Sequence, residues 1–208
     1  MKYKIIFLLL SILLMLGMTS CNLGKADHDT LAIIQQQPDS ESTNTFTNLH
    51  LGNIFDFSLE LPHADTTWVN IWVEGYQQGT AMPSTSLGSI SYGNSPNKID
   101  KGHMGFGMIH LANDKKAIFL YAPPTYTQPK IVDFTNIEDG PSVWAYAVGE
   151  DPVHLRAGEE ILLAAYRQIQ GTTMESFNPT KEKLKNMMEN DDLLLLLKMK
   201  VDMKEGAS

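Results

Sequence analysis

The sequence predicts a mainly β protein, an antiparallel β-sandwich of about eight to ten strands with a short C-terminal helix. From Phe55 onward, short runs of alternating polarity are separated by segments rich in Pro, Gly, Asn and Asp, which is typical of an all-β sandwich or barrel. The connections are too short for the helical crossovers that parallel strands require. Because the chain has only one cysteine, its core and not an internal disulfide must stabilise the fold.

Nine segments carry the alternating pattern that indicates strands. In chain order they read FDFSLEL, WVNIWVEGY, LGSISYG, HMGFGMIHL, KAIFLYAP, KIVDFTN, VWAYAVG, PVHL and EILLAAYRQ. Turn residues lie between them, and ANDKK is the clearest hairpin loop, because it joins two strong strands.

The segment before these strands, residues 21–50, is rich in Ser, Thr, Asn, Gln and Asp and has few large apolar residues. Such a composition buries too little apolar surface to order a chain. We therefore expect a flexible tether over residues 21–50 and a single β-sandwich domain over residues 51–208. Within the tether, AIIQQQ leaves open a short helix or an additional edge strand.

The C-terminal part differs from the strands before it. Asn178 can cap a helix that has Pro179 at its first position, so we expect a helix over residues 179–189. Residues 193–204 begin with leucines and end in strict alternation of apolar and charged residues. This alternation predicts a strand at a sheet edge, where lysines are common, whereas the leucines leave a continued helix as the alternative.

The N-terminus carries the most specific signal in the chain. MKYK supplies two lysines, an apolar run extends from Ile5 to Met18, and the small residues Thr19 and Ser20 follow. This order is that of a secretory signal peptide. The apolar run is about 14 residues long, shorter than the roughly 20 needed to span a bilayer as a helix. We therefore expect residues 1–20 to be removed on export.

The residues around Cys21 resemble the lipobox of bacterial lipoproteins, in which a branched aliphatic residue and two small residues precede a cysteine. The resemblance covers residues 1–21 only, and Met18 stands where leucine is commoner. It implies that Cys21 carries a diacylglycerol thioether and an N-acyl lipid, which anchor the chain at the extracytoplasmic face of a bacterial membrane. Two acyl chains suffice for stable anchoring. A plain secretory signal or an uncleaved signal anchor is the alternative.

The charge of the exported chain argues against some partners. Removal of Lys2 and Lys4 with the signal reduces the basic residues from 16 to 14 against 24 acidic ones, so the net charge changes from −8 to −10 with neutral histidines. This balance argues against nucleic acid as a partner and against adhesion to an anionic lipid surface. The expected partners are the bilayer, through Cys21, and a glycan or an envelope protein.

One strand supplies the candidate ligand-binding residues. Successive side chains of an extended chain point to opposite faces, so one side of WVNIWVEGY is aliphatic. The other side is aromatic and polar, with the residues Trp68, Asn70, Trp72, Glu74 and Tyr76. Indole rings four residues apart lie about 13 Å apart on a strand and could stack beneath an extended neutral sugar chain. The alternative is an ordinary core face, covered by the C-terminal helix.

Other segments carry weaker signals. Trp144 and Tyr146 share one face of a strand, but the small alanines on its reverse face favour close packing and therefore a core role. The glycines of GHMGFG indicate a β-bulge or a close approach within a sheet, since no helix follows as in a dinucleotide fingerprint. His103 and His110 are seven residues apart, so on one strand they face opposite sides and share no metal.

Enzyme motifs are absent from the sequence, including G-x-S-x-G, H-E-x-x-H, a phosphate loop and a cysteine pair. Two loop clusters leave a hydrolase or metal site open as an alternative, since sites concentrate on loops. One is His63 with Asp65, and the other is Glu150 and Asp151 with His154.

These observations predict a membrane-anchored lipoprotein that acts as a non-catalytic binding or accessory module for a glycan or an exported protein, without a cofactor. A first alternative is a structural subunit of an envelope assembly, which would pair with a partner through a sandwich edge or the C-terminal strand. A second alternative is an envelope hydrolase with a loop site near His63 and His154.

Overall fold

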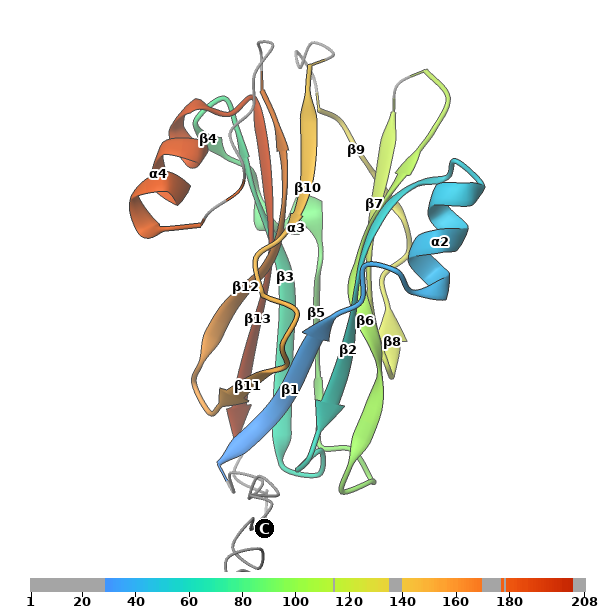
Figure 1. The fold of residues 1–208 in the computed structure, drawn as a ribbon, viewed down its shortest axis with the longest axis vertical. Helices are drawn as coiled ribbons and strands as arrows, with labels where there is room; N and C mark the ends of the chain where they lie inside the picture. The colour runs from blue at the N-terminus through green and yellow to red at the C-terminus, as the bar shows by residue number, and fades with distance from the viewer. Residues whose placement is uncertain (1–28, 114, 135–139, 170–176, 178, 204–208) are drawn as a thin grey trace, which may run out of the picture.

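The computed structural model describes residues 29–113, 115–134, 140–169, 177 and 179–203. They form two antiparallel sheets that pack face to face, which confirms the predicted mainly β sandwich with a short C-terminal helix. Figure 1 views the two layers from their edge. Each of the nine predicted segments contains a strand, and ANDKK lies at the predicted hairpin.

Sheet A has seven strands. Their order is β11 (Val153–Arg156), β1 (Thr30–Gln36), β2 (Gly52–Leu61), β6 (Asp100–His110), β7 (Lys116–Ala122) and β8 (Thr125–Tyr126), and β9 (Lys130–Val132) also pairs with β7. Sheet B has six strands. Their order is β10 (Ser142–Tyr146), β12 (Glu160–Gln168), β13 (Leu193–Met203), β3 (Thr67–Gln77) and β4 (Thr80–Ala81), and β5 (Ser89–Gly93) also pairs with β3.

The inward faces of both sheets form the main core. Ile71 of β3 is fully buried there, as the alternation of β3 predicts. Trp144 and Tyr146 also point inward, with ring centroids 4.7 and 5.2 Å from that of Phe55. The predicted core role of this aromatic pair is therefore confirmed.

The glycines of β6 allow aromatic rings to lie flat on the outward face of sheet A. A Cβ atom at Gly105 would meet the Tyr121 hydroxyl, and one at Gly107 would overlap the Phe119 ring. The registers of β6 with β2 and β7 are continuous, without a bulge. Of the two predicted uses of these glycines, close approach is the one observed.

The predicted tether over residues 21–50 is wrong in its larger part. Residues Thr30–Gln36 form β1, which lies inside sheet A between β11 and β2, and Glu41–Asn48 form helix α2. Leu31 and Ile34 of β1 are fully buried, so AIIQQQ belongs to an internal strand and not to a helix or an edge strand. The polar composition of the whole segment hides this short apolar pattern. Residues 21–28 lie outside the described residues.

The C-terminal helix and strand are both present. Helix α4 (Lys181–Asn190) is capped by Thr180, whose hydroxyl accepts from the Lys183 N–H at 3.3 Å; the predicted cap, Asn178, lies outside the described residues. Residues Leu193–Met203 form strand β13, so the predicted strand is confirmed and the alternative of a continued helix is wrong. Its predicted edge position is wrong, because β13 pairs with β12 and β3 along its length. Its lysines face solvent from a central strand, so β13 offers no free edge to a partner.

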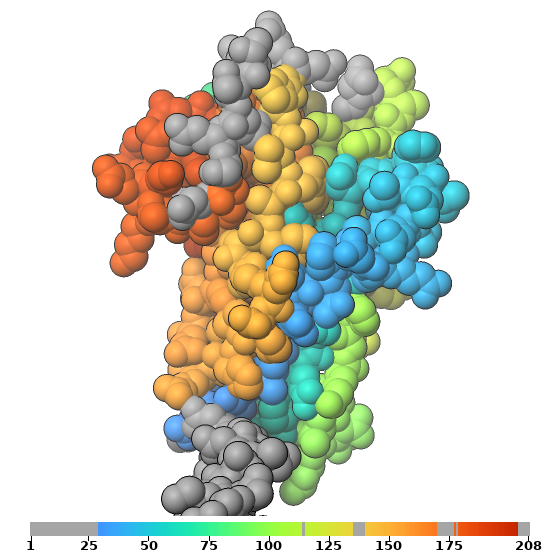
Figure 2. Space-filling model, in the orientation of Figure 1, coloured from blue at the N-terminus to red at the C-terminus, as the bar shows by residue number. Residues whose placement is uncertain are grey.

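The helices lie on the outward faces of the sandwich. In Figure 1, α4 lies outside sheet B and α2 outside sheet A, both toward the upper end, and Figure 2 shows them projecting from opposite sides of the body. The short helix α3 (Ser84–Leu87) connects β4 to β5. Strand β1 begins and β13 ends at the lower end, whereas the β3–β4 and β6–β7 turns lie at the upper end.

Candidate functional site

The predicted ligand-binding residues lie on the outward face of sheet B, opposite the core. They alternate with the buried residues of β3, and all five are partly buried: Trp68, Asn70, Trp72, Glu74 and Tyr76. The sheet register places Ser91 of β5 beside Asn70 and Lys198 of β13 beside Trp72. The structure therefore brings the five predicted residues together on one face and adds polar neighbours from two strands.

Helix α4 covers only the upper part of this face. Its Met187 forms a small buried cluster with Leu194 and Leu196 of β13, and Tyr76 packs against that cluster. The helix end is held by a buried ion pair in which Arg167 of β12 donates from Nε to Asp191 Oδ2 at 2.7 Å. At the Tyr76 end, the core interpretation of the face is thus correct.

Trp68 and Trp72 have different surroundings from Tyr76. Neither indole belongs to the two hydrophobic clusters of the described residues, nor to the partly buried side chains packed against those clusters. They lie below α4, with Trp68 near the lower end of β3 and Trp72 at the middle of the strand. We call the area formed by Trp68, Asn70, Trp72, Glu74 and Lys198 the tryptophan face.

Charged side chains fix the geometry of the tryptophan face. The Trp72 Nε1–H donates to Glu74 Oε1 at 3.1 Å. Lys198 donates from Nζ to Glu74 and to Glu160, each at 3.1 Å. Burial alone would lower the pKa of Lys198, but these two hydrogen bonds raise it above its ordinary value. The lysine therefore stays charged and holds Glu74, which in turn orients the Trp72 ring.

Asn70 supplies the hydrogen-bonding group between the two indoles. Its Oδ1 accepts from Ser91 Oγ at 2.8 Å. An amide also has two N–H donors, and the structure gives those of Asn70 no protein partner among the described residues. Aromatic surface beside directional donors and acceptors is suited to ligands that have both apolar faces and hydroxyl groups, as sugars do.

The two predicted loop clusters do not form one site. His154 lies on β11 opposite Ile33, which in turn pairs with Glu60 of β2, so His154 and Glu60 are separated by about 10 Å, two strand spacings. His63 lies beyond the end of β2, where its carbonyl oxygen accepts from the Thr67 hydroxyl at 2.6 Å. Within the described residues, nothing in this geometry therefore favours a hydrolase site at these histidines.

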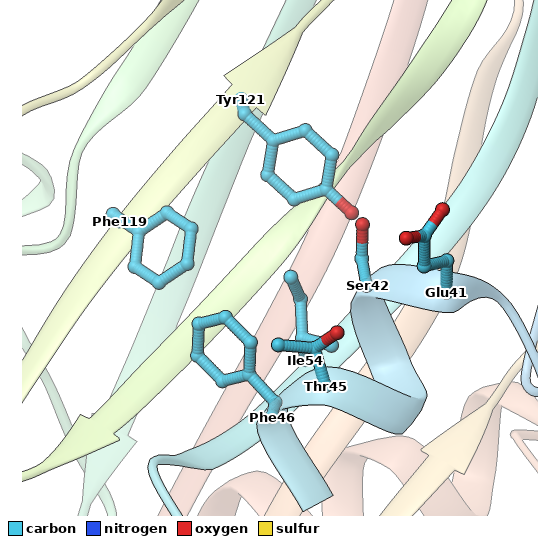
Figure 3. Close-up of a pocket in the computed structure, with 7 residues that line it drawn as sticks. All are labelled: Glu41, Ser42, Thr45, Phe46, Ile54, Phe119 and Tyr121. Atoms are coloured by element: carbon cyan, nitrogen blue, oxygen red, sulfur yellow. The ribbon is translucent and has the colours of Figure 1, made fainter. Parts of the chain in front are cut away.

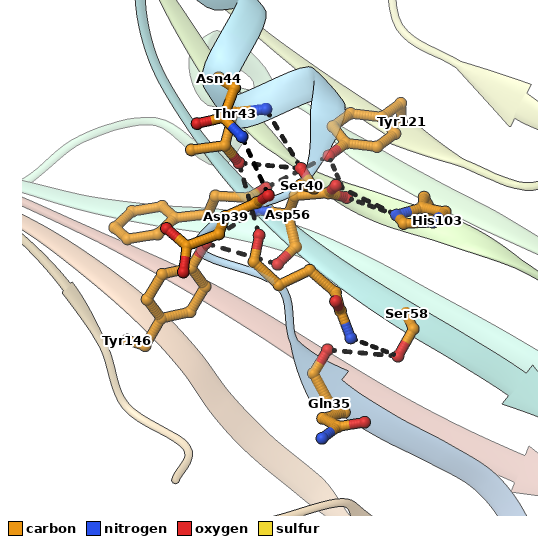
Figure 4. Close-up of polar contacts among 12 residues, drawn as sticks. Gln35, Asp39, Ser40, Thr43, Asn44, Asp56, Ser58, His103, Tyr121 and Tyr146 are labelled. Carbon is orange, nitrogen blue, oxygen red and sulfur yellow. Dashed lines mark hydrogen bonds and ion pairs between the residues drawn. The ribbon is translucent and has the colours of Figure 1, made fainter. Parts of the chain in front are cut away.

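A different histidine is paired with a carboxylate, which the sequence analysis missed. Asp56 of β2 is fully buried on the outward side of sheet A and accepts from the Tyr121 hydroxyl at 2.7 Å. His103 Nδ1 lies 3.0 Å from its other oxygen, and the His103 side chain is 56% exposed. Figure 4 shows both side chains converging on Asp56 beneath the start of α2. Burial and the neighbouring Asp56 raise the pKa of Tyr121.

The Asp56 cluster joins four strands, β2, β6, β7 and β10, and the segment that leads into α2, where the Gln37 N–H donates to the Asp56 carbonyl oxygen at 2.8 Å. Ser40 caps α2 by accepting from the Thr43 N–H at 3.1 Å, and the Tyr146 hydroxyl accepts from the Asp56 N–H at 3.2 Å across the core. Asp56 and His103 are 47 residues apart, so only the pairing of β2 with β6 brings them together. No local sequence signal could have identified this pair.

Helix α2 rests loosely on sheet A. Its ring contact is Phe46 with Phe119, at 5.9 Å between centroids, and no α2 residue is fully buried. Figure 3 shows the shallow cavity between them, about 410 Å³ in volume. Its lining residues are Glu41, Ser42, Thr45, Phe46, Ile54, Phe119 and Tyr121.

Within the part of the chain that the structure describes, no three His, Cys, Asp or Glu side chains form a group that could hold a metal ion. In the same part, no helix has the length and apolar character needed to cross a membrane. Comparisons with protein-family models, with curated proteins and with solved structures find no match to this chain.

Proposed function

We propose that this protein is a lipid-anchored, extracytoplasmic binding module without catalytic activity, and that its ligand lies across the tryptophan face. The observation that supports this proposal is the position of Trp68 and Trp72. Both lie on the outward face of a strand whose inward face is fully occupied by the core, and neither belongs to a hydrophobic cluster of the described residues. Large aromatic side chains outside a core are typical of binding surfaces.

The proposed ligand is a neutral glycan or an extended segment of an exported protein. Two indoles about 13 Å apart along β3 match ligands that are extended and repeat a flat apolar surface. Asn70 donors and the Glu74 carboxylate lie between and beside the rings and would bind hydroxyl or amide groups. The exported chain is acidic, so a polyanionic ligand is disfavoured.

The anchor in this proposal is a lipid on Cys21. Eight residues, 22–29, separate Cys21 from the start of β1, and a chain of this length reaches at most about 30 Å. Because β1 begins at the lower end of the sandwich, that end would lie near the bilayer. The tryptophan face, which begins at Trp68 near the lower end of β3, would then bind ligands close to the membrane surface.

A Cys21→Ser variant tests the anchor. We expect loss of lipidation, with either an unprocessed precursor in the membrane or release of the protein to the medium. Metabolic labelling with a fatty acid and fractionation of cells measure both effects. Normal processing and unchanged membrane retention of the variant would contradict the lipoprotein assignment.

Ligand capture tests the binding function. The domain from Asp29 onward, immobilised through its C-terminus, is presented to a glycan array and to an envelope extract. We expect a defined glycan or protein to be retained by the wild type and lost by the double variant Trp68→Ala/Trp72→Ala. The matched control is Tyr126→Ala, which removes an aromatic ring that is 68% exposed on an edge strand of sheet A. Equal retention by the double variant and the control would refute the proposed site.

A further inference from the structure

A second cavity opens between the two sheets at the upper end of the sandwich, away from the tryptophan face. Its volume is about 770 Å³, which is within the range of cavities that hold small organic ligands. Strands β2, β6, β7 and β9 of sheet A contribute to one wall, and β10 and β12 of sheet B contribute to the other. The residues that line it include Asn53, His110, Lys116, Phe134, Trp144 and Tyr166.

The cavity exists because inward-facing positions become polar at this end. On β2, the alternation that places Phe55 in the core continues upward to Asn53. On β6 it continues from the buried Met108 to His110, and on β7 from the buried Ile118 to Lys116. These polar side chains line the space between the sheets. They do not fill it with apolar contacts, as Phe55, Met108 and Ile118 do in the core below. The core therefore ends in an open space with polar walls.

The floor of the cavity is aromatic. The ring centroids of Trp144 and Tyr166 lie 5.1 Å apart, and Trp144 is also stacked on Phe106 of the core at 6.0 Å. Trp144 is partly exposed, whereas Tyr166 is almost fully buried. A flat apolar group that entered the cavity would thus meet a rigid aromatic surface.

A cation lies beside this floor. The Lys116 Nζ is 5.6 Å from the Tyr166 ring centroid and 6.0 Å from that of Phe134, and it donates to the Tyr166 hydroxyl at 3.4 Å. That hydroxyl donates onward to Gln168 Oε1 at 2.9 Å. Within the described residues, Lys116 has no carboxylate partner. Lys116 thus places a positive charge at the cavity lining.

One further lysine lies at the cavity. Lys115 lines it, and among the described lining residues Asp133 is the one carboxylate. Burial and the charge of Lys116 lower the pKa of His110, so the neutral imidazole is favoured and His110 lines the cavity as a polar group without charge. Two lysines against one described carboxylate give this lining a positive balance, whereas the whole chain has a net charge of −8.

We infer that this interlayer cavity binds a small organic carboxylate with a flat apolar body. The carboxylate would accept hydrogen bonds from Lys116, with Asn53 as a further donor, and the apolar body would lie on Trp144. A charged hydrogen bond supplies orientation and a rigid aromatic floor supplies apolar contact, the combination found in small-molecule sites. This inference does not depend on the function proposed for the tryptophan face.

The test uses the soluble domain and three probes of similar shape: phenylacetate, neutral phenylacetamide and benzylphosphonate. Chemical shifts of the three tryptophan indole N–H groups are followed by NMR during titration, after assignment with Trp→Phe variants. We expect saturable shifts of the Trp144 signal with phenylacetate, and about tenfold weaker binding of phenylacetamide, since one charged hydrogen bond is lost. Tighter binding of benzylphosphonate would assign the cavity to phosphonate-like anions and overturn the carboxylate inference.

Variants separate the cavity from a general charge effect. Lys116→Met should weaken phenylacetate binding about tenfold, and Lys116→Arg should retain it. The control is Lys101→Met, which removes a lysine that is 65% exposed at the lower end. Thermal melting shows whether each variant is folded. Absence of saturable shifts at Trp144 in the folded wild type, or equal weakening by Lys116→Met and Lys101→Met, would overturn the inference.

Discussion

The two halves of the outward face of β3 differ in what covers them. At the upper half, Tyr76 packs against the cluster beneath α4, and the Arg167–Asp191 ion pair holds the helix end. At the lower half, Trp68 and Trp72 lie outside the hydrophobic clusters. Trp72 donates to Glu74, and Trp68 lies opposite Asp202 of β13. A single alternating strand thus contributes to a small core at one end and to a polar, aromatic surface at the other.

The alternation of a strand therefore does not by itself assign a role to an outward-facing residue. Alternation separates the inward from the outward face of a strand. Whether the outward face is covered depends on where a distant element packs. Here that element is a helix more than a hundred residues later in the chain.

The largest expected effect concerns the ion pair that holds α4. In Asp191→Ala, Arg167 would remain buried without its carboxylate, and we expect a loss of about 3–5 kcal/mol in the free energy of unfolding. Urea denaturation measures this loss. The double variant Arg167→Met/Asp191→Ala should recover much of it, because no uncompensated charge remains. A loss below about 1 kcal/mol in the single variant would mean that α4 is held by other contacts.

The next effect compares adjacent residues on opposite faces of β3. Ile71→Ala should lower the free energy of unfolding by about 2–5 kcal/mol, as expected for a fully buried side chain. Trp72→Ala removes a larger side chain but should cost only about 1–2 kcal/mol, less than the roughly 3–5 kcal/mol for a buried tryptophan. Denaturant melts of both variants provide the comparison. An equal or larger cost for Trp72→Ala would assign the tryptophan face to the core.

A smaller effect on the free energy of unfolding is expected from a change of pH. It arises at Tyr121, on the outward face of sheet A beneath α2. Burial and Asp56 raise the pKa of Tyr121 in the folded state above its unfolded value of about 10. Its contribution to stability is therefore complete below pH 10 and decreases as pH rises further, by up to about 1.4 kcal/mol per pH unit. Tyr121→Phe should flatten this decrease. Unfolding measured between pH 9 and 11 with an identical slope in both proteins would contradict the buried Tyr121–Asp56 contact.

The strands could be predicted because each has a local pattern. Residues such as Val69 and Ile71 alternate with polar neighbours over several positions, so period and turn residues identify the strand. Strand β1 was predicted only as one of two alternatives, an additional edge strand, since its few buried apolar residues stand in a polar segment and gain their partners only from β2 and β11. The start of α4 was also misplaced, because a helix can begin at Pro179 as well as after it. In the structure Thr180 is the cap and the helix begins at Lys181.

The site was predictable only in part, for a related reason. Trp68 and Trp72 share a strand, so their common face follows from alternation. Asp56 and His103 come from separate strands, and the wall of the interlayer cavity combines His110 and Lys116 with Trp144. Contacts of this kind depend on strand order, which the alternating pattern does not contain.

The most direct test of the central claim is the affinity of the captured ligand for matched variants of the two halves of β3. We predict that Trp68→Ala/Trp72→Ala, in the folded domain, reduces the affinity at least about tenfold, since two central aromatic contacts are lost. Tyr76→Phe, which changes the half beneath α4, should leave the affinity unchanged. Isothermal titration calorimetry with the captured ligand measures both. Wild-type affinity in the double tryptophan variant, or a comparable loss in Tyr76→Phe, would contradict the proposal that the ligand lies across the tryptophan face.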